Sequence, residues 1–344
     1  MEVGIVGSTG YGGVELNRIL SNHPGIEKCI LYSSSLDGDD YTEQYPHLID
    51  LTNESVRSIQ FDEMKQLDVV FLAVPAGISK NLTPKLLGGK AKIIDLSGDL
   101  RLQGPEEYEQ WYKAEAADVS ILGEAVYGLT ECNREAIKGA DLIANPGCFP
   151  TATLLALAPV MQGHLIRPGS VIVDAKTGLS GAGRKPSLSS HYSETQENLR
   201  IYKVHEHQHT PEIEQQLNCW AHEPAPITFT THLIPMTRGI MTTIYADLLE
   251  ERTTEEIHEE YLRYYHESPF VRLRPIGQYP STKEVWGSNF CDIGMKVDQR
   301  TGKLTIVSVI DNLMKGAAGQ AVQNMNIMFG LEETTGLQYY PIYP

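Results

Sequence analysis

One cysteine stands in a setting that suits a nucleophile. Cys148 lies in the run Asn-Pro-Gly-Cys-Phe-Pro-Thr, after an expected buried strand and before the apolar stretch 152–161. A cysteine at a helix N-terminus has its thiolate favoured by the helix dipole and by free backbone N–H groups. Most free cysteines are small buried side chains without chemistry, but here proline and glycine hold the thiol in a fixed turn. We therefore expect Cys148 to be the nucleophile.

A glycine-rich turn near the N-terminus has the spacing of a dinucleotide site. Gly7, Gly10 and Gly13 form a G-x-x-G-x-x-G pattern between an expected strand and an expected helix. Small residues let the backbone approach a pyrophosphate, whose charge the N–H groups and the helix dipole favour. Helix–strand packing alone could also require such glycines, but their position between strand and helix favours a cofactor. The expected cofactor-binding residues here are Gly7, Ser8, Thr9, Gly10, Tyr11, Gly12 and Gly13.

The residues after the second expected strand favour NADP over NAD. A carboxylate at this point would bind the ribose hydroxyls of NAD and repel a 2′-phosphate. The chain instead has Ser33, Ser34 and Ser35, with Asp37 a little farther on and no arginine near in the sequence. An ordinary polar turn would have the same composition. We expect these serines to bind NADP(H).

A thiolate combined with a nicotinamide cofactor predicts the reduction of an activated acyl group. The thiol attacks the carbonyl to form a thioester, and hydride then reduces that acyl group to an aldehyde. An acyl phosphate is a suitable donor because phosphate leaves readily.

Three histidines within five residues are candidates for proton transfer: His205, His207 and His209. Histidine titrates in the range that a general base for a thiol requires. The same spacing could bind zinc on a strand, but no fixed fourth ligand is evident. We expect acid–base chemistry and no metal.

Anionic substrate groups need cations, and several basic residues stand in glycine-containing turns. They are Arg101, Arg184, Lys185 and Arg238. An arginine in such a turn can project into a cleft and hold phosphate or carboxylate through two hydrogen bonds. Ser180 and Gly181 could also form a backbone nest near the cofactor or the substrate.

The pattern of apolar residues predicts an α/β fold with two domains. Buried strands are expected at 3–6, 29–32, 69–74, 93–96 and 141–144, alternating with helices. This pattern is typical of a Rossmann-type doubly wound domain. From about residue 172 the strands are rich in β-branched residues, which predicts an α+β domain. Helices are expected after the capping pair Thr253 and Glu256 and at about 317–329.

Composition excludes several classes of protein. The 344 residues have a net charge of -16 and are 41% hydrophobic, which indicates a folded protein without a basic face for nucleic acid or anionic membranes. Five scattered cysteines without a Cys-x-x-Cys pair exclude a disulfide framework. No apolar stretch approaches the roughly 20 residues of a membrane span, and no signal-peptide pattern opens the chain. We expect a cytoplasmic protein.

Together these motifs resemble the N-acetyl-gamma-glutamyl-phosphate reductase family. The Cys148 run and the glycine-rich start carry the resemblance, and it extends along nearly the whole chain. Further blocks in the family's order are residues 95–102, 178–185, 207–213, 235–239 and 311–321. Two positions depart from the pattern: Gln208 stands where the family usually has arginine, and Ala76 where many relatives have histidine.

The resemblance implies a reaction and residue roles. The reaction is the NADPH-dependent reduction of N-acetyl-L-glutamyl 5-phosphate to N-acetyl-L-glutamate 5-semialdehyde and phosphate, in arginine biosynthesis. Cys148 forms the thioester, and His207 is the first choice for acid–base work with His209 as the alternative. The implied substrate-binding residues are Arg101, Arg184 and Arg238, and Asn312 is implied to reach the nicotinamide amide.

The resemblance also implies the domain organisation. A dinucleotide-binding domain comprises 1–147 and 312–344, because the chain returns to it through the last helix. The catalytic and oligomerisation domain comprises 148–311, and the enzyme is a homodimer or homotetramer.

Three alternatives remain open. An aspartate-semialdehyde dehydrogenase uses the same chemistry, but its cysteine usually lies in an N-C-[ST] context. An aminoadipyl-phosphate reductase is harder to exclude. An NADP-binding regulatory protein would keep the glycine-rich turn but would need neither Cys148 nor the histidine cluster.

Overall fold

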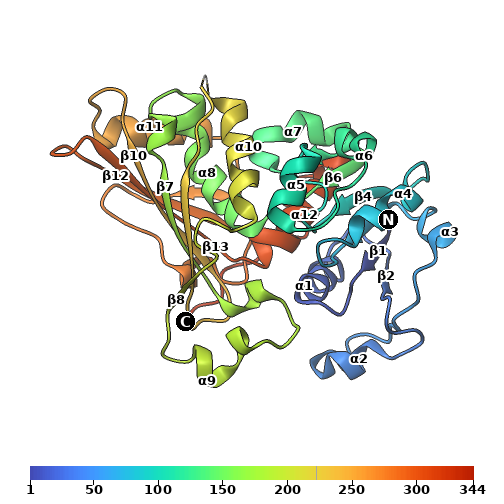
Figure 1. Cartoon of the computed structure of the whole chain (residues 1–344). Coiled ribbons are helices and arrows are strands. Elements are labelled where there is room, and N and C mark those ends of the chain that lie inside the picture. The colour runs from blue at the N-terminus through green and yellow to red at the C-terminus, as the bar shows by residue number, and fades with distance from the viewer. Residues whose placement is uncertain (222) are drawn as a thin grey trace. The chain divides into compact units, whose positions relative to one another are not determined.

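The computed structural model describes residues 1–221 and 223–344, which divide into two units (Figure 1). Unit 1 comprises Met1–Pro146 and Ala317–Gln338, and unit 2 comprises Gly147–Gly316 and Tyr339–Pro344. The segment of the C-terminal region that clusters with unit 1 is therefore shorter than the expected 312–344. Each unit contains its own sheet.

Among the described residues, unit 1 has a six-stranded sheet with the order β2-β1-β3-β4-β6-β5, in which every pairing is parallel. The strands are β1 (Glu2–Val6), β2 (Lys28–Tyr32), β3 (Val69–Leu72), β4 (Lys92–Asp95), β5 (Val126–Tyr127) and β6 (Leu142–Ala144). This confirms the doubly wound prediction. The strand order reverses between β1 and β3, and a parallel sheet of this kind binds ligands at such a point.

Helices cover both faces of the unit 1 sheet. Alternate strand residues such as Val70 and Ile93 belong to a core shared with Leu82 and Leu86 of α4 (Ser79–Leu86). A second group of helices packs together from distant parts of the chain. It comprises α1 (Tyr11–Leu20), α7 (Thr130–Lys138) and α12 (Gly319–Met328).

Buried amide side chains explain why α12 belongs to unit 1. Every residue of α12 is buried, so its polar groups need partners inside the protein. Gln320 Nε2 donates to the Gly128 carbonyl at 2.9 Å, and Asn324 Nδ2 donates to the same carbonyl at 2.8 Å. Asn326 Oδ1 contacts the ring nitrogen of His23 at 2.9 Å. These bonds join α12 to segments about 190 to 300 residues earlier in the chain.

The sheet of unit 2 is mixed, as its sequence predicts. In the described part of the unit, seven strands lie in the order β11-β12-β13-β10-β7-β9-β8, with parallel pairs β7/β9 and β11/β12 and antiparallel pairs elsewhere. Their bounds are β7 (Ile172–Thr177), β8 (Arg200–Tyr202), β9 (Thr228–Leu233), β10 (Ile240–Asp247), β11 (Val271–Leu273), β12 (Cys291–Asp298) and β13 (Lys303–Ile310).

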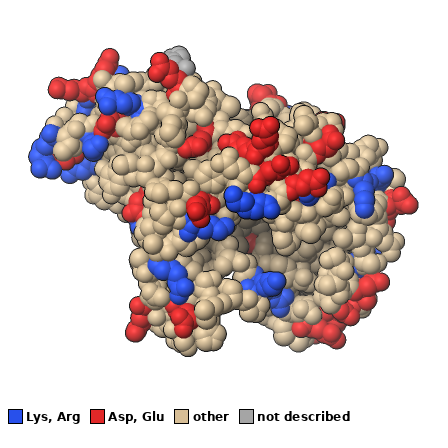
Figure 2. Space-filling model, viewed as in Figure 1, with Lys and Arg blue, Asp and Glu red and all other residues tan. Residues whose placement is uncertain are grey.

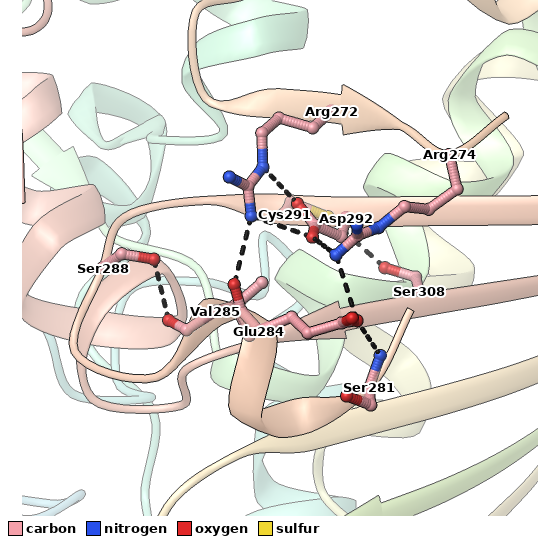
Figure 3. Close-up of polar contacts among 9 residues, drawn as sticks. All are labelled: Arg272, Arg274, Ser281, Glu284, Val285, Ser288, Cys291, Asp292 and Ser308. Carbon is pink, nitrogen blue, oxygen red and sulfur yellow. Dashed lines mark hydrogen bonds and ion pairs between the residues drawn. The ribbon is translucent and has the colours of Figure 1, made fainter. Parts of the chain in front are cut away.

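Charged side chains hold the short strand β11 at one edge of this sheet. Asp292 of β12 is fully buried and accepts hydrogen bonds from two guanidinium groups (Figure 3). Arg272 binds both of its carboxylate oxygens, at 2.6 and 2.9 Å, and Arg274 binds one of them and also Glu284. Because a buried carboxylate needs such partners, the two arginines stabilise the edge of the sheet.

Three of the helices described in unit 2 pack together: the central one packs against the other two and against the sheet (Figure 1). They are α8 (Cys148–Gln162), α10 (His209–Trp220) and α11 (Thr254–Tyr264). The predicted capping box is confirmed, because Thr253 Oγ1 accepts from the Glu256 N–H while the Glu256 carboxylate accepts from the Thr253 N–H. Among the described residues, no helix is both long and apolar enough to cross a bilayer. Figure 2 shows acidic and basic side chains intermingled over the face in view.

A proline inside α8 creates a requirement that α11 meets. Pro159 has no N–H, so it cannot donate to the Leu155 carbonyl one turn earlier. The Tyr265 hydroxyl, just after α11, donates to that carbonyl instead. The Tyr261 hydroxyl donates to the neighbouring Ala156 carbonyl at 2.5 Å. Two tyrosines thus donate to neighbouring carbonyls of the helix that begins at Cys148, and one of them replaces the donor that Pro159 lacks.

We predict that Tyr265→Phe lowers the free energy of unfolding by about 1–3 kcal/mol, because it leaves the Leu155 carbonyl buried without its donor. Urea-induced unfolding measures the loss. The matched background is Pro159→Ala, which supplies the missing N–H. In that background we expect Tyr265→Phe to cost much less, and an equal loss in both backgrounds would contradict this explanation.

Candidate active site

Cys148 is the first residue of α8, with Gly147 as the N-cap. The helix therefore begins four residues earlier than the predicted 152–161, and the thiol lies within its first turn. No side chain caps the helix, and its first turn contains no acidic residue. The positive end of the helix dipole thus acts on the half-buried thiol, which favours the thiolate.

Two contacts fix the turn that contains Cys148. The Gly147 N–H donates to the Glu212 carboxylate at 2.8 Å, and Glu212 is fully buried. On the other side, a Cβ placed on Gly316 would lie 2.8 Å from the Cβ of Cys148, so glycine is needed there. Glu212 belongs to α10, and the sequence suggested no role for it. The sequence feature that could have drawn attention to Glu212 is that it is an acidic residue in the first turn of a helix.

His207 lies buried in a cage of aromatic rings. The cage consists of Phe149, Tyr202 and Phe229, with ring centroids 5.4 to 5.7 Å from that of His207. The Nδ1 atom accepts a hydrogen bond from the His209 N–H at 3.1 Å, which places the ring proton on Nε2. Burial, and secondarily the charge of Lys203, lower the pKa of His207 to about 3. The ring is therefore neutral at physiological pH.

His209 is the first residue of α10 and is also buried. Its ring lies 4.8 Å from that of His207 and 6.0 Å from that of Phe149, the residue after Cys148. The structure therefore brings both predicted histidines to the segment that contains the nucleophile. His205, in contrast, is exposed and has a positive φ of 57°. Among the described residues, no group of three or more His, Cys, Asp or Glu side chains could hold a metal ion.

Tyr202 contacts the same group of residues. Burial raises the pKa of its hydroxyl, and the charge of Cys148 raises it further. Its carbonyl accepts from Thr231 Oγ1 at 2.8 Å, which ties the end of β8 to β9. Sequence reasoning missed Phe229, which comes from β9, some 20 residues after the histidines, and Tyr202, which lies close to them at the end of β8.

The predicted cationic residues have different environments. Arg238 pairs with the buried Asp311 at 3.4 Å, and Arg184 is exposed in the turn after Ala182; both belong to unit 2. Arg101 belongs to unit 1, where its guanidinium donates to the carbonyls of Asn145 and Leu96, each at 2.8 Å. The three arginines are thus not brought together within one unit.

The predicted cofactor residues of unit 2 form a bonded cluster. Asn312 Nδ2 donates to Ser180 Oγ at 2.9 Å, and Asn312 Oδ1 accepts from the Gly239 N–H at 2.7 Å. The N–H groups of Ser180 and Gly181 donate to the carbonyls of Thr237 and Gly178. These backbone donors therefore have partners within the protein, which weakens the prediction of an anion-binding nest.

The glycine-rich turn of unit 1 has the features of a pyrophosphate cradle. Gly7 has φ +83°, which favours glycine, and a Cβ on Gly13 would clash with the Gly7 carbonyl. A Cβ on Gly12 would meet nothing within 4 Å, so the backbone is open to a ligand there. Helix α1 begins after Gly10 without a side-chain cap or an acidic first turn. These residues fit the diphosphate of NADP.

Two tyrosines from another segment donate hydrogen bonds to backbone carbonyls of this turn. The Tyr41 hydroxyl donates to the Ser8 carbonyl at 2.9 Å, and the Tyr45 hydroxyl donates to the Thr9 carbonyl at 3.0 Å. Bonds to these carbonyls help to fix the orientation of the peptide groups. The sequence offered no signal for this pairing, because the two tyrosines follow the turn by more than 30 residues.

The serine segment after β2 has an arginine beside it in the fold, although none is near in the sequence. The backbone carbonyl of Arg57 accepts a hydrogen bond from the Ser33 N–H, and the backbone N–H of Arg57 donates to the Leu31 carbonyl. Its half-exposed side chain contacts Glu63 at 3.0 Å. Ser33 is buried, while Ser34 and Ser35 are exposed. Backbone pairing brings together residues that are more than 20 positions apart in the sequence.

Two family descriptions match the chain. "Semialdehyde dehydrogenase, NAD binding domain" matches residues 2–140, and "Semialdehyde dehydrogenase, dimerisation domain" matches residues 148–312. The N-acetyl-gamma-glutamyl-phosphate reductase of Bacillus subtilis is 59% identical over 345 residues, covering all of both chains.

Solved structures show the same fold at low identity. Aspartate semialdehyde dehydrogenase II of Vibrio cholerae has a TM-score of 0.73 and 16% identity, covering 96% of this chain and 98% of that one. The aspartate semialdehyde dehydrogenase of Candida albicans, solved with NADP, has a TM-score of 0.67 and 14% identity, covering 95% and 98%. At such identity the likeness concerns the fold alone.

We predict that His207 makes the protein less stable as the pH falls. An unfolded histidine binds a proton near pH 6.5, whereas the folded site does so only near pH 3. Between pH 7 and pH 5 the unfolded state therefore binds more protons, which lowers the free energy of unfolding by about 2 kcal/mol. His207→Asn, which can keep an acceptor for the His209 N–H, removes this contribution.

Urea-induced unfolding at pH 7, 6 and 5 measures the difference between His207→Asn and the wild type. The matched control is His205→Asn, which changes an exposed histidine in the same segment. We expect the control to follow the wild type. If His207→Asn also loses stability in parallel with the wild type, His207 does not have the lowered pKa.

Proposed function

This chain belongs to the N-acetyl-gamma-glutamyl-phosphate reductase family, and from that membership we propose the roles of its individual residues in the reaction. The enzyme reduces N-acetyl-L-glutamyl 5-phosphate to N-acetyl-L-glutamate 5-semialdehyde and phosphate with NADPH, in arginine biosynthesis. This function is favoured over that of an aspartate-semialdehyde dehydrogenase, an aminoadipyl-phosphate reductase or a regulatory protein. The full-length relatives carry the reductase name, while the two solved aspartate enzymes share the fold at 16% and 14% identity.

One observation supports the proposed roles most strongly. Cys148 begins α8, and the residue after it, Phe149, contacts the rings of both His207 and His209. The thiol at the N-terminus of α8 and the two imidazole rings therefore lie in the same region of unit 2, next to Phe149. This combination is what a thiol nucleophile needs for activation.

In the first step, Cys148 Sγ attacks the acyl carbon of the substrate. The bond from that carbon to the phosphate oxygen then breaks, phosphate leaves with the bonding electrons, and a thioester remains on Cys148. NADPH, when bound, supplies the hydride that reduces the thioester carbonyl. Breaking the carbon–sulfur bond then releases the aldehyde and restores the thiolate, which the dipole of α8 stabilises.

We assign proton transfer to His209 and a positioning role to His207. The Nδ1 atom of His207 accepts the His209 N–H, and burial keeps the His207 ring neutral, so it is poorly suited to take a second proton. His209 begins α10, three residues before the Glu212 carboxylate that binds the Gly147 N–H. This assignment reverses the order of preference that the sequence suggested.

Binding of the anionic groups is assigned to residues of each unit. Arg184 and Arg238 of unit 2 and Arg101 of unit 1 are proposed for the phosphate and carboxylate of the substrate. In unit 1, the Gly7–Gly13 turn is proposed for the diphosphate of NADPH, and Ser33, Ser34, Ser35 and Arg57 for its 2′-phosphate. The open backbone at Gly12 and the half-exposed Arg57 support these assignments.

The enzyme is a homo-oligomer, as its match to a dimerisation domain indicates. We propose a homodimer or homotetramer. We also propose that it acts in the cytoplasm. Its five free cysteines, including the reactive Cys148, suit a reducing compartment, and the reaction is a biosynthetic one.

Kinetics of two matched variants test the histidine roles. We expect His209→Asn to lower kcat/KM by about 10²- to 10⁴-fold, because it removes a general acid–base group. We expect His207→Asn to lower it less and to keep the acidic limb of the pH–rate profile, which His209→Asn abolishes. NADPH affinity, measured by fluorescence, serves as the control and stays unchanged in both. If the limb survives in His209→Asn and is lost in His207→Asn, the roles are exchanged.

A further inference from the structure

A buried polar cage lies at the carboxyl end of β4 in unit 1. Asp95, the last residue of β4, is fully buried. One of its oxygens accepts the Ser97 N–H at 2.9 Å, and the other lies 2.9 Å from both Ser79 Oγ and Ser97 Oγ. The two serine hydroxyls are 2.7 Å apart. No step of the proposed reaction uses these residues.

Asp99 joins this cage to the start of α4. Its Oδ1 atom accepts the Gly77 N–H at 2.6 Å and the Tyr108 hydroxyl at 2.7 Å. Its Oδ2 atom accepts the Lys80 N–H and the Ser79 hydroxyl, each at 3.1 Å. The loop after β3 is thus held at its end by the carboxylate of Asp99.

That loop borders the cofactor-binding turn. It follows β3, the strand next to β1 where the strand order reverses, and ligands bind at the carboxyl ends of strands there. A Cβ on Gly7 would clash with the Ala73 carbonyl, so the glycine-rich turn lies directly against residues 73 and 74, where this loop begins. A change in the conformation of this loop would therefore alter the position of the turn that binds the diphosphate.

An extra proton would fill more of the contacts in the cage. Four oxygen–oxygen contacts join Asp95, Ser97, Ser79 and Asp99, but the two serines supply only two hydroxyl hydrogens. With a proton on Asp95, a chain of donors can run from Asp95 to Ser97, to Ser79 and to the Asp99 carboxylate, so that three of the four contacts hold a hydrogen. Without that proton only two do, and the two carboxylates share fewer donors, which is costly in a buried site.

We propose that Asp95, Ser97, Ser79 and Asp99 form a proton-sharing positioning device that keeps the 73–78 loop in the shape that binds NADPH. Burial raises the pKa of Asp95 to about 6, and the charge of Asp99 contributes to this. The device acts through the loop and does not touch the substrate. It rests on the NADPH site assigned above.

Other polar groups face the cage from neighbouring segments. The Tyr108 ring stacks on that of Tyr112 at 4.4 Å, and burial raises the pKa of the Tyr108 hydroxyl. The Lys80 ammonium bonds to the Glu115 carbonyl, and Arg101 donates to the carbonyl of Leu96, next to Asp95. Burial raises the pKa of Asp95 to about 6, so its proton is lost as the pH rises through that value.

The sign of the effect follows from the raised pKa. The protonated cage is the stable one, so its contribution to the loop is complete at low pH and is lost as the pH rises past about 6. NADPH then binds a less ordered loop and its Kd increases. Asp95→Asn imitates the protonated acid at every pH and removes this dependence.

Fluorescence titration of the substrate-free enzyme with NADPH tests the proposal between pH 5.5 and pH 8. The measured quantity is the ratio of the wild-type Kd to that of Asp95→Asn, because titration of the cofactor's own phosphate cancels in this ratio. We expect the ratio to rise about fivefold or more across the range. Tyr108→Phe, which keeps the stacked ring and the Asp95 proton, is the matched control and follows the pH dependence of the wild type.

Amide hydrogen exchange of the cofactor-free protein gives an independent readout. Residues 77–80 are expected to exchange faster at pH 8 than at pH 5.5, after correction for intrinsic rates, in the wild type but not in Asp95→Asn. A constant Kd ratio together with unchanged exchange overturns the proposal. If Asp95→Asn does not fold, Ser79→Ala is tested in its place. We expect Ser79→Ala to raise the Kd for NADPH and to speed amide exchange at residues 77–80. An unchanged Kd in that variant overturns the proposal. Failure of the wild type to bind NADPH would instead refute the assigned cofactor site.

Discussion

The hydrogen bond from the Gly147 N–H to the buried carboxylate of Glu212 is the constraint on which the active site depends. It joins the N-cap of α8 to the first turn of α10, so that one helix presents Cys148 and the other begins with His209. Gly316 closes the other side of the turn. Pro159 leaves α8 short of one backbone donor, and Tyr265 replaces it. The position of one sulfur atom therefore depends on contacts from several remote segments of unit 2.

The N-terminus of a helix serves both units in the same physical way. In unit 1 the start of α1 offers its N–H groups to a diphosphate, and in unit 2 the start of α8 stabilises a thiolate. Neither helix has an acidic residue in its first turn, although the whole chain has a net charge of -16. The net charge of the chain therefore does not indicate where anions bind. The local dipoles of the two helix N-termini stabilise anions at these positions.

The sequence predicted the features that local patterns encode and missed those that depend on distant pairing. The doubly wound sheet, the mixed second sheet, the capping box at Thr253 and the position of Cys148 before a helix all follow from short motifs. The return of α12 to unit 1 was implied by the family resemblance alone, because it depends on amide bonds to segments such as Gly128 that no local pattern encodes. Arg57 and Glu212 were missed for the same reason, since only the fold brings them beside Ser33 and Gly147.

The proposed thioester between Cys148 and the substrate can be trapped by single-turnover mixing without NADPH. The enzyme is mixed with N-acetylglutamyl phosphate, phosphate release is followed in time, and the protein is then digested for peptide mass analysis. We predict a burst of one phosphate per active site and an N-acetylglutamyl group on the peptide that contains Cys148. No burst from an enzyme that reduces the substrate once NADPH is added, or an acyl group on another residue, would contradict the assignment of Cys148.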